Sequence, residues 1–289
     1  MAGGDARVTA GPADLAPEPL VPGCRVLAPI SNRAALSVKT IEITDPPTLA
    51  SLVARFGSCQ ESFVLDSAQS RYGLGEWSFF GAEPFASIKA VDLGALRNFL
   101  QPYNAMAHQW IPFCGGAVGY LSYDYGRRLE HLPVCAADER EIADLYFALY
   151  DGVAAYHHAS GRLFLAACGM NEPPAQMLAR LRERVEGPEP ECGAEPRLGP
   201  WSWNLSEADF CRAVERIRRH IASGDVYQIN LSRRARCTFS GDPLTLYQTL
   251  RQGNPAPYGA FLRTGELTLL STSPEQFIRK RGRDLETRP

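Results

Sequence analysis

The sequence lacks any long hydrophobic run. None of its 289 residues belongs to a stretch approaching the roughly 18 consecutive apolar residues of a membrane-spanning helix. The segment Met1 to Pro22 is rich in alanine, glycine and proline, and it has no apolar core of the kind that a secretory signal carries. We therefore expect a cytoplasmic protein without membrane contact, with a disordered tail over residues 1–22.

An excess of one charge is also missing. Lysine and arginine number 30 against 32 aspartate and glutamate residues, which gives a net charge of -2 and a pI near 6.2. Neither basic residue type forms a long block, and the cluster Arg233, Arg234 and Arg236 is typical of the solvated end of a strand. This balance disfavours a surface for nucleic acid or for an anionic membrane.

Paired cysteines are absent as well. The eight cysteines form no C-x-x-C pair and have no histidine at zinc-ligand spacing, which indicates reduced thiols. His157 and His158 are adjacent, and neighbours on a strand point to opposite faces, so a surface pair is favoured over a metal site. We assign no metal ligand within this chain.

The sequence does contain enough apolar residues for a large core. It is 45% hydrophobic and 21% charged, which is typical of a globular chain with one large or two ordinary domains. The segment 186–200 has the proline- and glycine-rich composition of a linker. We predict a first region over 23–185, this linker, and a second region over 201–289.

Hydrophobic periodicity predicts a mixture of strands and helices, without internal repeats. The predicted strands cover 36–43, 62–67, 77–80, 113–124, 145–156, 162–167, 258–262 and 267–271, with a last hairpin over 278–289. The predicted helices cover 48–56, 93–100, 174–185 and 206–223, with another that begins at 242–243 and a single helical turn at 273–276.

A helix stop and a strand start coincide in the stretch 223–234. Ser206 is a candidate N-cap for the helix before it, and Gly224 is a candidate for the residue just past the helix C-terminus. The period then changes to two, which places Gln228 and Asn230 on one face of a predicted strand. An amide pair on such a strand faces either water or a polar cavity.

Several motifs occur in an order typical of one family. They are Val64-Leu65-Asp66-Ser67, Trp77-Ser78-Phe79-Phe80-Gly81, Gly224-Asp225-Val226-Tyr227-Gln228-Ile229-Asn230-Leu231, Asn254-Pro255-Ala256-Pro257-Tyr258, Ser273-Pro274-Glu275-Gln276-Phe277 and Glu286-Thr287-Arg288-Pro289. By their order and spacing, the chain resembles the chorismate-utilising enzymes over about residues 36–289. Within that family it is most similar to component I of aminodeoxychorismate synthase, followed by component I of anthranilate synthase.

The resemblance implies a fold and a reaction. The fold is α+β and anthranilate synthase component I-like, with two antiparallel β-sheets packed face to face, helices outside, and both regions interleaved in one body. The reaction converts chorismate, with ammonia from a partner glutamine amidotransferase, into 4-amino-4-deoxychorismate for para-aminobenzoate and folate synthesis. Relatives continue into a P-I-x-G-T segment, and the ligands of a magnesium cofactor are expected there, beyond residue 289.

Two residues acquire catalytic roles from this resemblance. Glu275, the acid of the S-P-E motif, is implied as a proton donor that burial keeps protonated, because hydroxide leaves poorly. Gln228 stands where water-adding relatives have a lysine base; an amide cannot deprotonate water, which suits ammonia and points away from isochorismate and salicylate synthases. From the residues alone, Glu275 also fits the first turn of a helix and Gln228 a hydrogen-bonded strand position.

A tryptophan pocket is implied as well. Its residues map onto Ser67, Leu74, Gly75, Glu76, Trp77, Pro257, Tyr258 and Gly259. The aminodeoxychorismate pattern has an arginine where this chain has Glu76, and the reversed charge repels the carboxylate of an amino-acid ligand. The alternative is that the segment belongs to the core.

Two other functions stay open at this point. Anthranilate synthase component I is one, because the residue that distinguishes the two products lies past Pro289. A non-catalytic module that binds an amidotransferase or tryptophan is the other, because the chain stops in mid-pattern. For the chain as it stands we expect no turnover and exposed sheet edges.

Overall fold

The structure is a computed structural model that describes residues 25–26, 38–69, 73–90, 92–103, 110–133, 142–191 and 193–288. The predicted tail over 1–22 lies outside these residues. The helices are α1 (Leu49–Gly57), α2 (Leu93–Leu100), α3 (Gly126–Leu129), α4 (Pro174–Glu186), α5 (Glu207–Ala222) and α6 (Pro243–Gly253), with a 3-10 turn over Tyr123–Tyr125. The strands are β1 (Arg25–Val26), β2 (Lys39–Ile43), β3 (Glu61–Asp66), β4 (Trp77–Ala82), β5 (Ala86–Ala90), β6 (Gly116–Leu121), β7 (Leu145–Tyr150), β8 (Gly152–His157), β9 (Arg162–Ala167), β10 (Arg197–Leu198), β11 (Ser202–Trp203), β12 (Ala235–Arg236), β13 (Phe239–Ser240), β14 (Tyr258–Thr264), β15 (Thr268–Ser273), β16 (Gln276–Arg281) and β17 (Asp284–Arg288).

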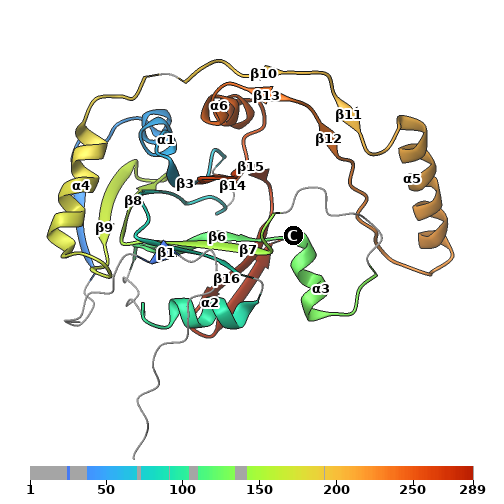
Figure 1. The fold of residues 1–289 in the computed structure, drawn as a ribbon, viewed down its shortest axis with the longest axis horizontal. Coiled ribbons are helices and arrows are strands. Elements are labelled where there is room, and N and C mark those ends of the chain that lie inside the picture. Colours follow the sequence, from blue (N-terminus) through green and yellow to red (C-terminus); the bar gives the residue numbers. More distant parts are fainter. Residues whose placement is uncertain are drawn as a thin grey trace, which may run out of the picture.

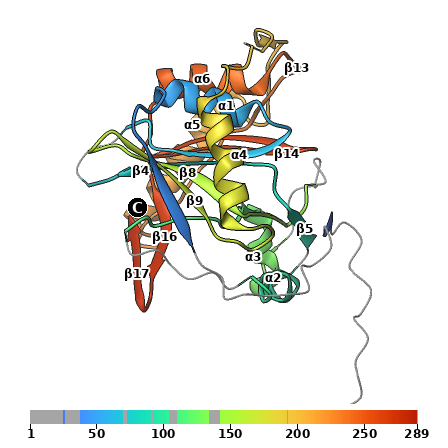
Figure 2. The same ribbon diagram turned by 90° about the vertical axis from the view of Figure 1, so that its left-hand side faces the viewer.

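Two antiparallel sheets form the body of the molecule. The larger has seven strands in the order β15-β14-β3-β4-β8-β9-β2, and the smaller has four in the order β1-β5-β7-β6. Figure 1 shows the sheets as two layers, with α1 and α6 above the larger sheet and α2 below the smaller one. Figure 2 shows α4 lying along the same outer side as α1, over β8 and β9.

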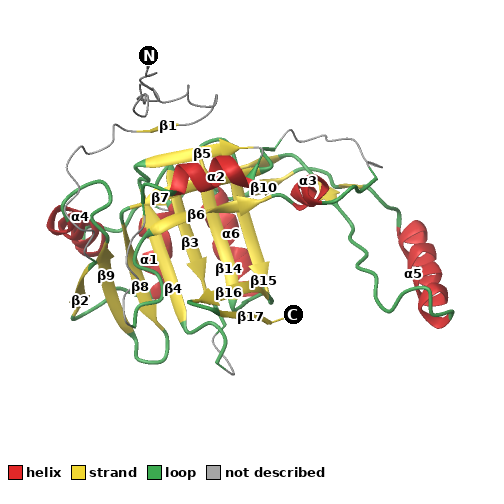
Figure 3. Cartoon of the chain, turned by 90° about the horizontal axis from the view of Figure 1, so that it is seen from below, coloured by secondary structure: helices red, strands yellow, loops and turns green. Residues whose placement is uncertain are grey.

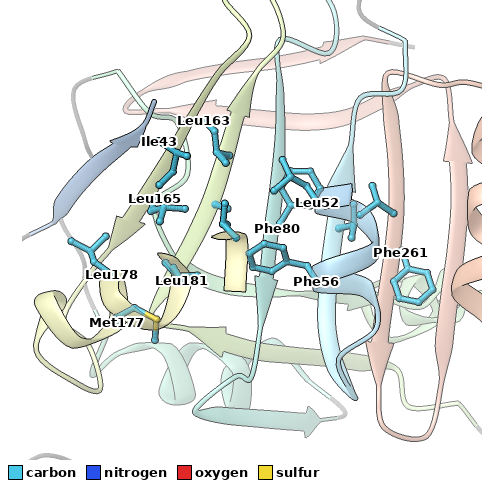
Figure 4. Close-up of a cluster of buried hydrophobic side chains, with 14 of the residues drawn as sticks. Ile43, Leu52, Phe56, Phe80, Leu163, Leu165, Met177, Leu178, Leu181 and Phe261 are labelled. Atoms are coloured by element: carbon cyan, nitrogen blue, oxygen red, sulfur yellow. The ribbon is translucent and has the colours of Figure 1, made fainter. Parts of the chain in front are cut away.

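Three apolar clusters hold these layers together. Between the sheets, Phe63 of the larger sheet packs with Ala148 and Tyr150 of the smaller one. On the outer face of the larger sheet, Phe56 and Phe80 meet beneath α1, and the apolar side of α4 covers β9 (Figure 4). Ile88, Leu96 and Leu145 form the third cluster under α2. The predicted α+β fold with face-to-face antiparallel sheets and outer helices is confirmed.

The two predicted regions share one sheet. Strand β14, from the second region, lies between β15 and β3, with Phe261 opposite Val64 and Gly259 opposite Asp66. Gly259 allows a close approach, because a Cβ there would lie 3.2 Å from the Tyr247 hydroxyl oxygen. The interleaving expected from the family is therefore present, while the division into domains stays a prediction.

An arm leaves this body and ends in a helix. We call residues 194–241 the arm: β10 pairs with β13 and β11 with β12 along its length, and α5 forms its tip (Figures 1 and 3). The predicted helix over 206–223 is confirmed, with the Ser206 hydroxyl accepting from the Asp209 amide and Gly224 at a φ of 81°. Within α5, which is described throughout, no residue is buried.

The strand predicted after Gly224 is wrong. Residues 225–234 have no strand partner in the described part of the chain, and the first ladder residue is Ala235. Tyr227 on the supposed apolar face is 93% exposed. Alternation alone cannot make a strand, because the backbone also needs a neighbour for its hydrogen bonds.

Two further predictions need correction. The single strand predicted over 145–156 is two strands, β7 and β8, which lie in different sheets and meet at Asp151. The helical turn predicted at 273–276 is a bend between β15 and β16. The Ser273 hydroxyl does accept from the Glu275 amide at 3.3 Å, as an N-cap side chain would. No helical turn follows, because the chain enters β16 at Gln276 and pairs there with β17. No helix in the described residues is long and apolar enough to span a bilayer.

Candidate active site and the Asp66 cluster

Ser67 joins three segments that the sequence separates. It follows β3, is buried, and its Oγ lies 2.9 Å from the carbonyl oxygens of both Trp77 and Pro257. The single hydroxyl proton is shared between these two acceptors, so the start of β4 and the start of β14 are fixed against the end of β3. The structure thus brings together most of the segments expected to form a tryptophan pocket.

The remaining residues of that expected pocket take different places. Gly75 has a φ of 65°, which favours glycine, and a Cβ there would lie 2.8 Å from the Gln69 carbonyl oxygen. The exposed Glu76 accepts the His158 amide through its backbone carbonyl. The Trp77 ring packs against Phe79 in the layer between the sheets, so this indole is part of the core. Leu74 and Tyr258 are both half-buried.

Behind Ser67 lies a closed polar network that we call the Asp66 cluster, made of Asp66, Ser67, Ser78, His158 and Arg251. Asp66 is 1% exposed; its Oδ2 pairs with the Arg251 guanidinium and its Oδ1 lies 3.2 Å from the Ser78 hydroxyl. Ser78, fully buried, also accepts the Ser67 amide at 3.0 Å and lies 2.9 Å from His158 Nε2. If Ser78 donates to Asp66, His158 donates through Nε2, and the Ser78 oxygen then accepts from both His158 and the Ser67 amide.

Burial and charge set the protonation states in this cluster. Burial lowers the pKa of His158, an effect that the Asp66 charge opposes and the Arg251 charge reinforces. Burial also raises the pKa of the neighbouring Tyr247 well above its usual value, and the Asp66 charge adds to the rise. The imidazole is therefore neutral at pH 7, and the carboxylate of Asp66 is neutralised by an internal arginine.

This cluster leaves little for an amino-acid ligand to bind. The Asp66 carboxylate already has a cationic partner, and the Ser67 proton is shared between two carbonyls. The sequence predicts a surface position for His158, whereas the residue is half-buried and belongs to this cluster. The available signal was the polar pair Asp66-Ser67 at the end of an apolar strand.

The two predicted catalytic residues lie on different parts of the molecule. Glu275 is exposed in the bend between β15 and β16, so it lacks the burial expected for a protonated acid. Gln228 is exposed in the arm, where its Nε2 donates to Asn230 Oδ1 at 3.3 Å. No hydrogen bond joins Gln228 to Glu275 among the described residues. The structure thus does not bring the two groups together.

A magnesium site does not fit the residues that the structure describes. Among them, no group of three or more histidine, cysteine, aspartate or glutamate side chains is arranged to hold a metal ion. Hard cations such as magnesium need oxygen ligands from carboxylates. Asp66, the most deeply buried carboxylate in the candidate site, is already paired with Arg251.

Comparisons with known proteins show which family the chain matches. A family model described as chorismate binding enzyme matches residues 61–289. Aminodeoxychorismate synthase component 1 of Bacillus subtilis is 32% identical over an alignment of 252 residues, and the match covers 78% of this chain and 53% of that protein. Anthranilate synthase component 1 of Thermus thermophilus is 38% identical over 62% of this chain and 39% of its own length. The chain spans about half the length of the curated relatives it matches.

A solved structure supports the fold. Anthranilate synthase component I from Streptococcus pneumoniae superposes with a TM-score of 0.53 at 20% identity, over 89% of this chain and 54% of that one.

Proposed function

Since this chain belongs to the family of chorismate-binding enzymes, we propose that it is the N-terminal portion of an aminodeoxychorismate synthase component I. In this proposal the enzyme works in the cytoplasm and converts chorismate and ammonia into 4-amino-4-deoxychorismate for folate synthesis. A partner glutamine amidotransferase supplies the ammonia. The observation that carries the proposal is the family match, which runs through both regions of the shared sheet and includes Glu275.

Glu275 is the acid in the proposed chemistry. A ring hydroxyl of chorismate leaves poorly as hydroxide, so a carboxylic acid that gives it a proton lowers the barrier. The exposed bend places Glu275 where a substrate can reach it. Covering of this bend, by substrate or by protein, would desolvate the carboxyl group and favour its protonated form.

Gln228 sets the class of nucleophile. Its amide can hold and orient a molecule by hydrogen bonds but cannot remove a proton from water. Ammonia needs no such base, because it is already a nucleophile. The residue therefore supports amination of chorismate over hydration. For Gln228 and Glu275 to act on one chorismate molecule, the arm has to bring Gln228 close to Glu275.

The experiment is product analysis with chorismate, ammonia and magnesium, run on the 289-residue chain and on a protein of the length of its relatives. We expect 4-amino-4-deoxychorismate from the longer protein and no turnover from the 289-residue chain. Glu275→Gln should lower kcat by at least about 100-fold, the usual contribution of a general acid. Exposed Glu130→Gln is the matched control. Anthranilate as the sole product would reject the proposed enzyme.

Anthranilate synthase component I is the second candidate, because relatives of both names match this chain. A non-catalytic role is favoured by a different observation, the separation of the exposed Gln228 from Glu275. Calorimetry with tryptophan and a pull-down with the amidotransferase test that role. We expect amidotransferase binding and no tryptophan binding, since the Asp66 cluster is internally satisfied; turnover by the 289-residue chain would refute the non-catalytic role.

A further inference from the structure

Tyr258 contacts both ends of the bend that carries Glu275. At the start of the bend it lies opposite Ser273 in the β14–β15 ladder. At the end its phenol O–H donates to Gln276 Oε1 at 3.0 Å. Ser273 closes the bend from within, because its Oγ lies 3.3 Å from the amide nitrogen and 3.1 Å from the carbonyl oxygen of Glu275. Tyr258 therefore reaches both sides of the turn made by Pro274 and Glu275, through its backbone on one side and through its phenol on the other.

Tyr258 is itself anchored in the larger sheet. The Ser67 hydroxyl fixes the carbonyl of Pro257, and Gly259 pairs with Asp66 in the β14–β3 ladder. Pro257 and Gly259, on either side of Tyr258, are thus both buried and both tied to the end of β3. A phenol held in this way has a defined position from which to hold a surface bend.

The far side of the bend is held by the β16–β17 hairpin. Gln276 lies opposite Arg288 in the ladder, and its carbonyl accepts from the Thr287 hydroxyl at 3.4 Å. The Arg288 guanidinium reaches the Gly73 carbonyl at 3.4 Å, on the segment between β3 and β4. The neighbouring carboxylate of Glu286 raises the pKa of Arg288, to which Tyr258 and Glu76 add smaller effects.

We propose that Tyr258 is a positioning residue for Glu275, acting through its hydrogen bond to Gln276. The inference rests on the proposed function, since that function assigns proton donation to Glu275. Tyr258 touches neither chorismate nor the transferred proton in this role. Ser67 and Pro257, which the family pattern assigns to an amino-acid pocket, then serve in this chain as the anchor of the bend.

The direct test is backbone amide exchange by NMR in the 289-residue chain, over residues 273–277. Tyr258→Phe removes one hydroxyl and should speed exchange at Glu275 and Gln276 about fivefold, as expected when a single hydrogen bond is lost locally. Tyr123→Phe, at a fully exposed tyrosine, is the matched control and should change nothing.

A double-mutant cycle identifies the bond itself. Gln276→Ala should give the same increase as Tyr258→Phe, and the double variant should add nothing further. Unchanged exchange in the bend would overturn the proposal. An increase spread evenly over the sheets, together with a lower Tm, would also overturn it, because Tyr258 would then be a merely structural residue.

Turnover separates this inference from the proposed function. In the product assay with the longer protein, Tyr258→Phe should lower kcat about fivefold and leave KM for chorismate unchanged, because the acid is misplaced while substrate binding is kept. If Glu275→Gln retains full turnover, the proposed function fails, and the exchange data alone decide whether Tyr258 holds the bend. If turnover needs Glu275 but ignores Tyr258→Phe, the positioning role is refuted.

Discussion

The side chain of Arg251 neutralises the most deeply buried carboxylate of the candidate site. Removing it leaves Asp66 charged and buried without a cation, which is costly in a low-dielectric environment. We expect Arg251→Met to lower the free energy of unfolding by about 3 kcal/mol in urea titrations. Arg162→Ala breaks an exposed pair with Glu42 and should have a much smaller effect. Equal losses from the two variants would contradict a buried-charge explanation.

His158 makes the stability of the fold depend on pH. Burial lowers its pKa in the folded state, whereas the unfolded imidazole takes up a proton near its ordinary value of 6.5. Its contribution is therefore fully present above pH 6.5 and is lost progressively as pH falls below that value. Urea titrations between pH 7.5 and 5.5 should show this loss.

His158→Asn should flatten the pH dependence over that interval. Asn keeps a hydrogen-bond donor for the Ser78 hydroxyl but does not titrate. His131→Asn, at an exposed site, is the control and should leave the slope as it was. A slope that survives in His158→Asn would assign the effect to another group.

At the scale of elements, Asp151 explains why one apolar run forms two strands. It is 2% exposed, and its carboxylate accepts the backbone amides of Met170, Asn171 and Glu172 at 2.6, 3.0 and 2.9 Å. These bonds hold the turn before α4 against the point where the chain passes from the smaller sheet to the larger. Periodicity could not reveal this, because β7 and β8 are both almost wholly buried and neither alternates.

Removing that carboxylate should loosen α4. We expect Asp151→Ala to lower the free energy of unfolding by about 3 kcal/mol, since three amides lose their acceptor. Asp151→Asn, which keeps one acceptor oxygen, should lose less. Chemical denaturation measures both, with exposed Asp45→Ala as the control. An unaltered midpoint in Asp151→Ala would show that water replaces the carboxylate.

The elements that sequence predicts well are those whose pattern is local. The strands over 62–67 and 77–80 and the helices over 48–56 and 174–185 were found because each shows its buried face within its own residues. The prediction of a strand after Gly224 was wrong because a strand needs a neighbouring strand to pair with, and local alternation does not show whether one is present. At the site, the meeting of Ser67 with Pro257 follows from the family pattern, whereas the contacts of His158 and Arg251 with Asp66 require the folded chain.

At the scale of the whole molecule, the arm should be the first part to yield to a protease. No residue of α5 is buried, and Arg212, Arg216, Arg218 and Arg219 are all exposed trypsin sites. Brief digestion followed by mass spectrometry should show cuts within 207–222 before any other cut in the described part of the chain. The body should persist as two fragments held together by the β14–β3 ladder. Earlier cleavage in α4, whose Arg180 is tied to Glu83, would contradict this order.

The shared sheet has a consequence for how the chain is made. Ser67 and Pro257 lie 190 residues apart in sequence, yet the Ser67 hydroxyl donates to the Pro257 carbonyl and so joins the end of β3 to the start of β14. During synthesis at about 5–20 residues per second, β3 must therefore wait ten seconds or more for β14, with one edge open to the wrong partner. The larger sheet can therefore close only after β14 has been synthesised, and until then the unpaired edge of β3 can pair with another strand.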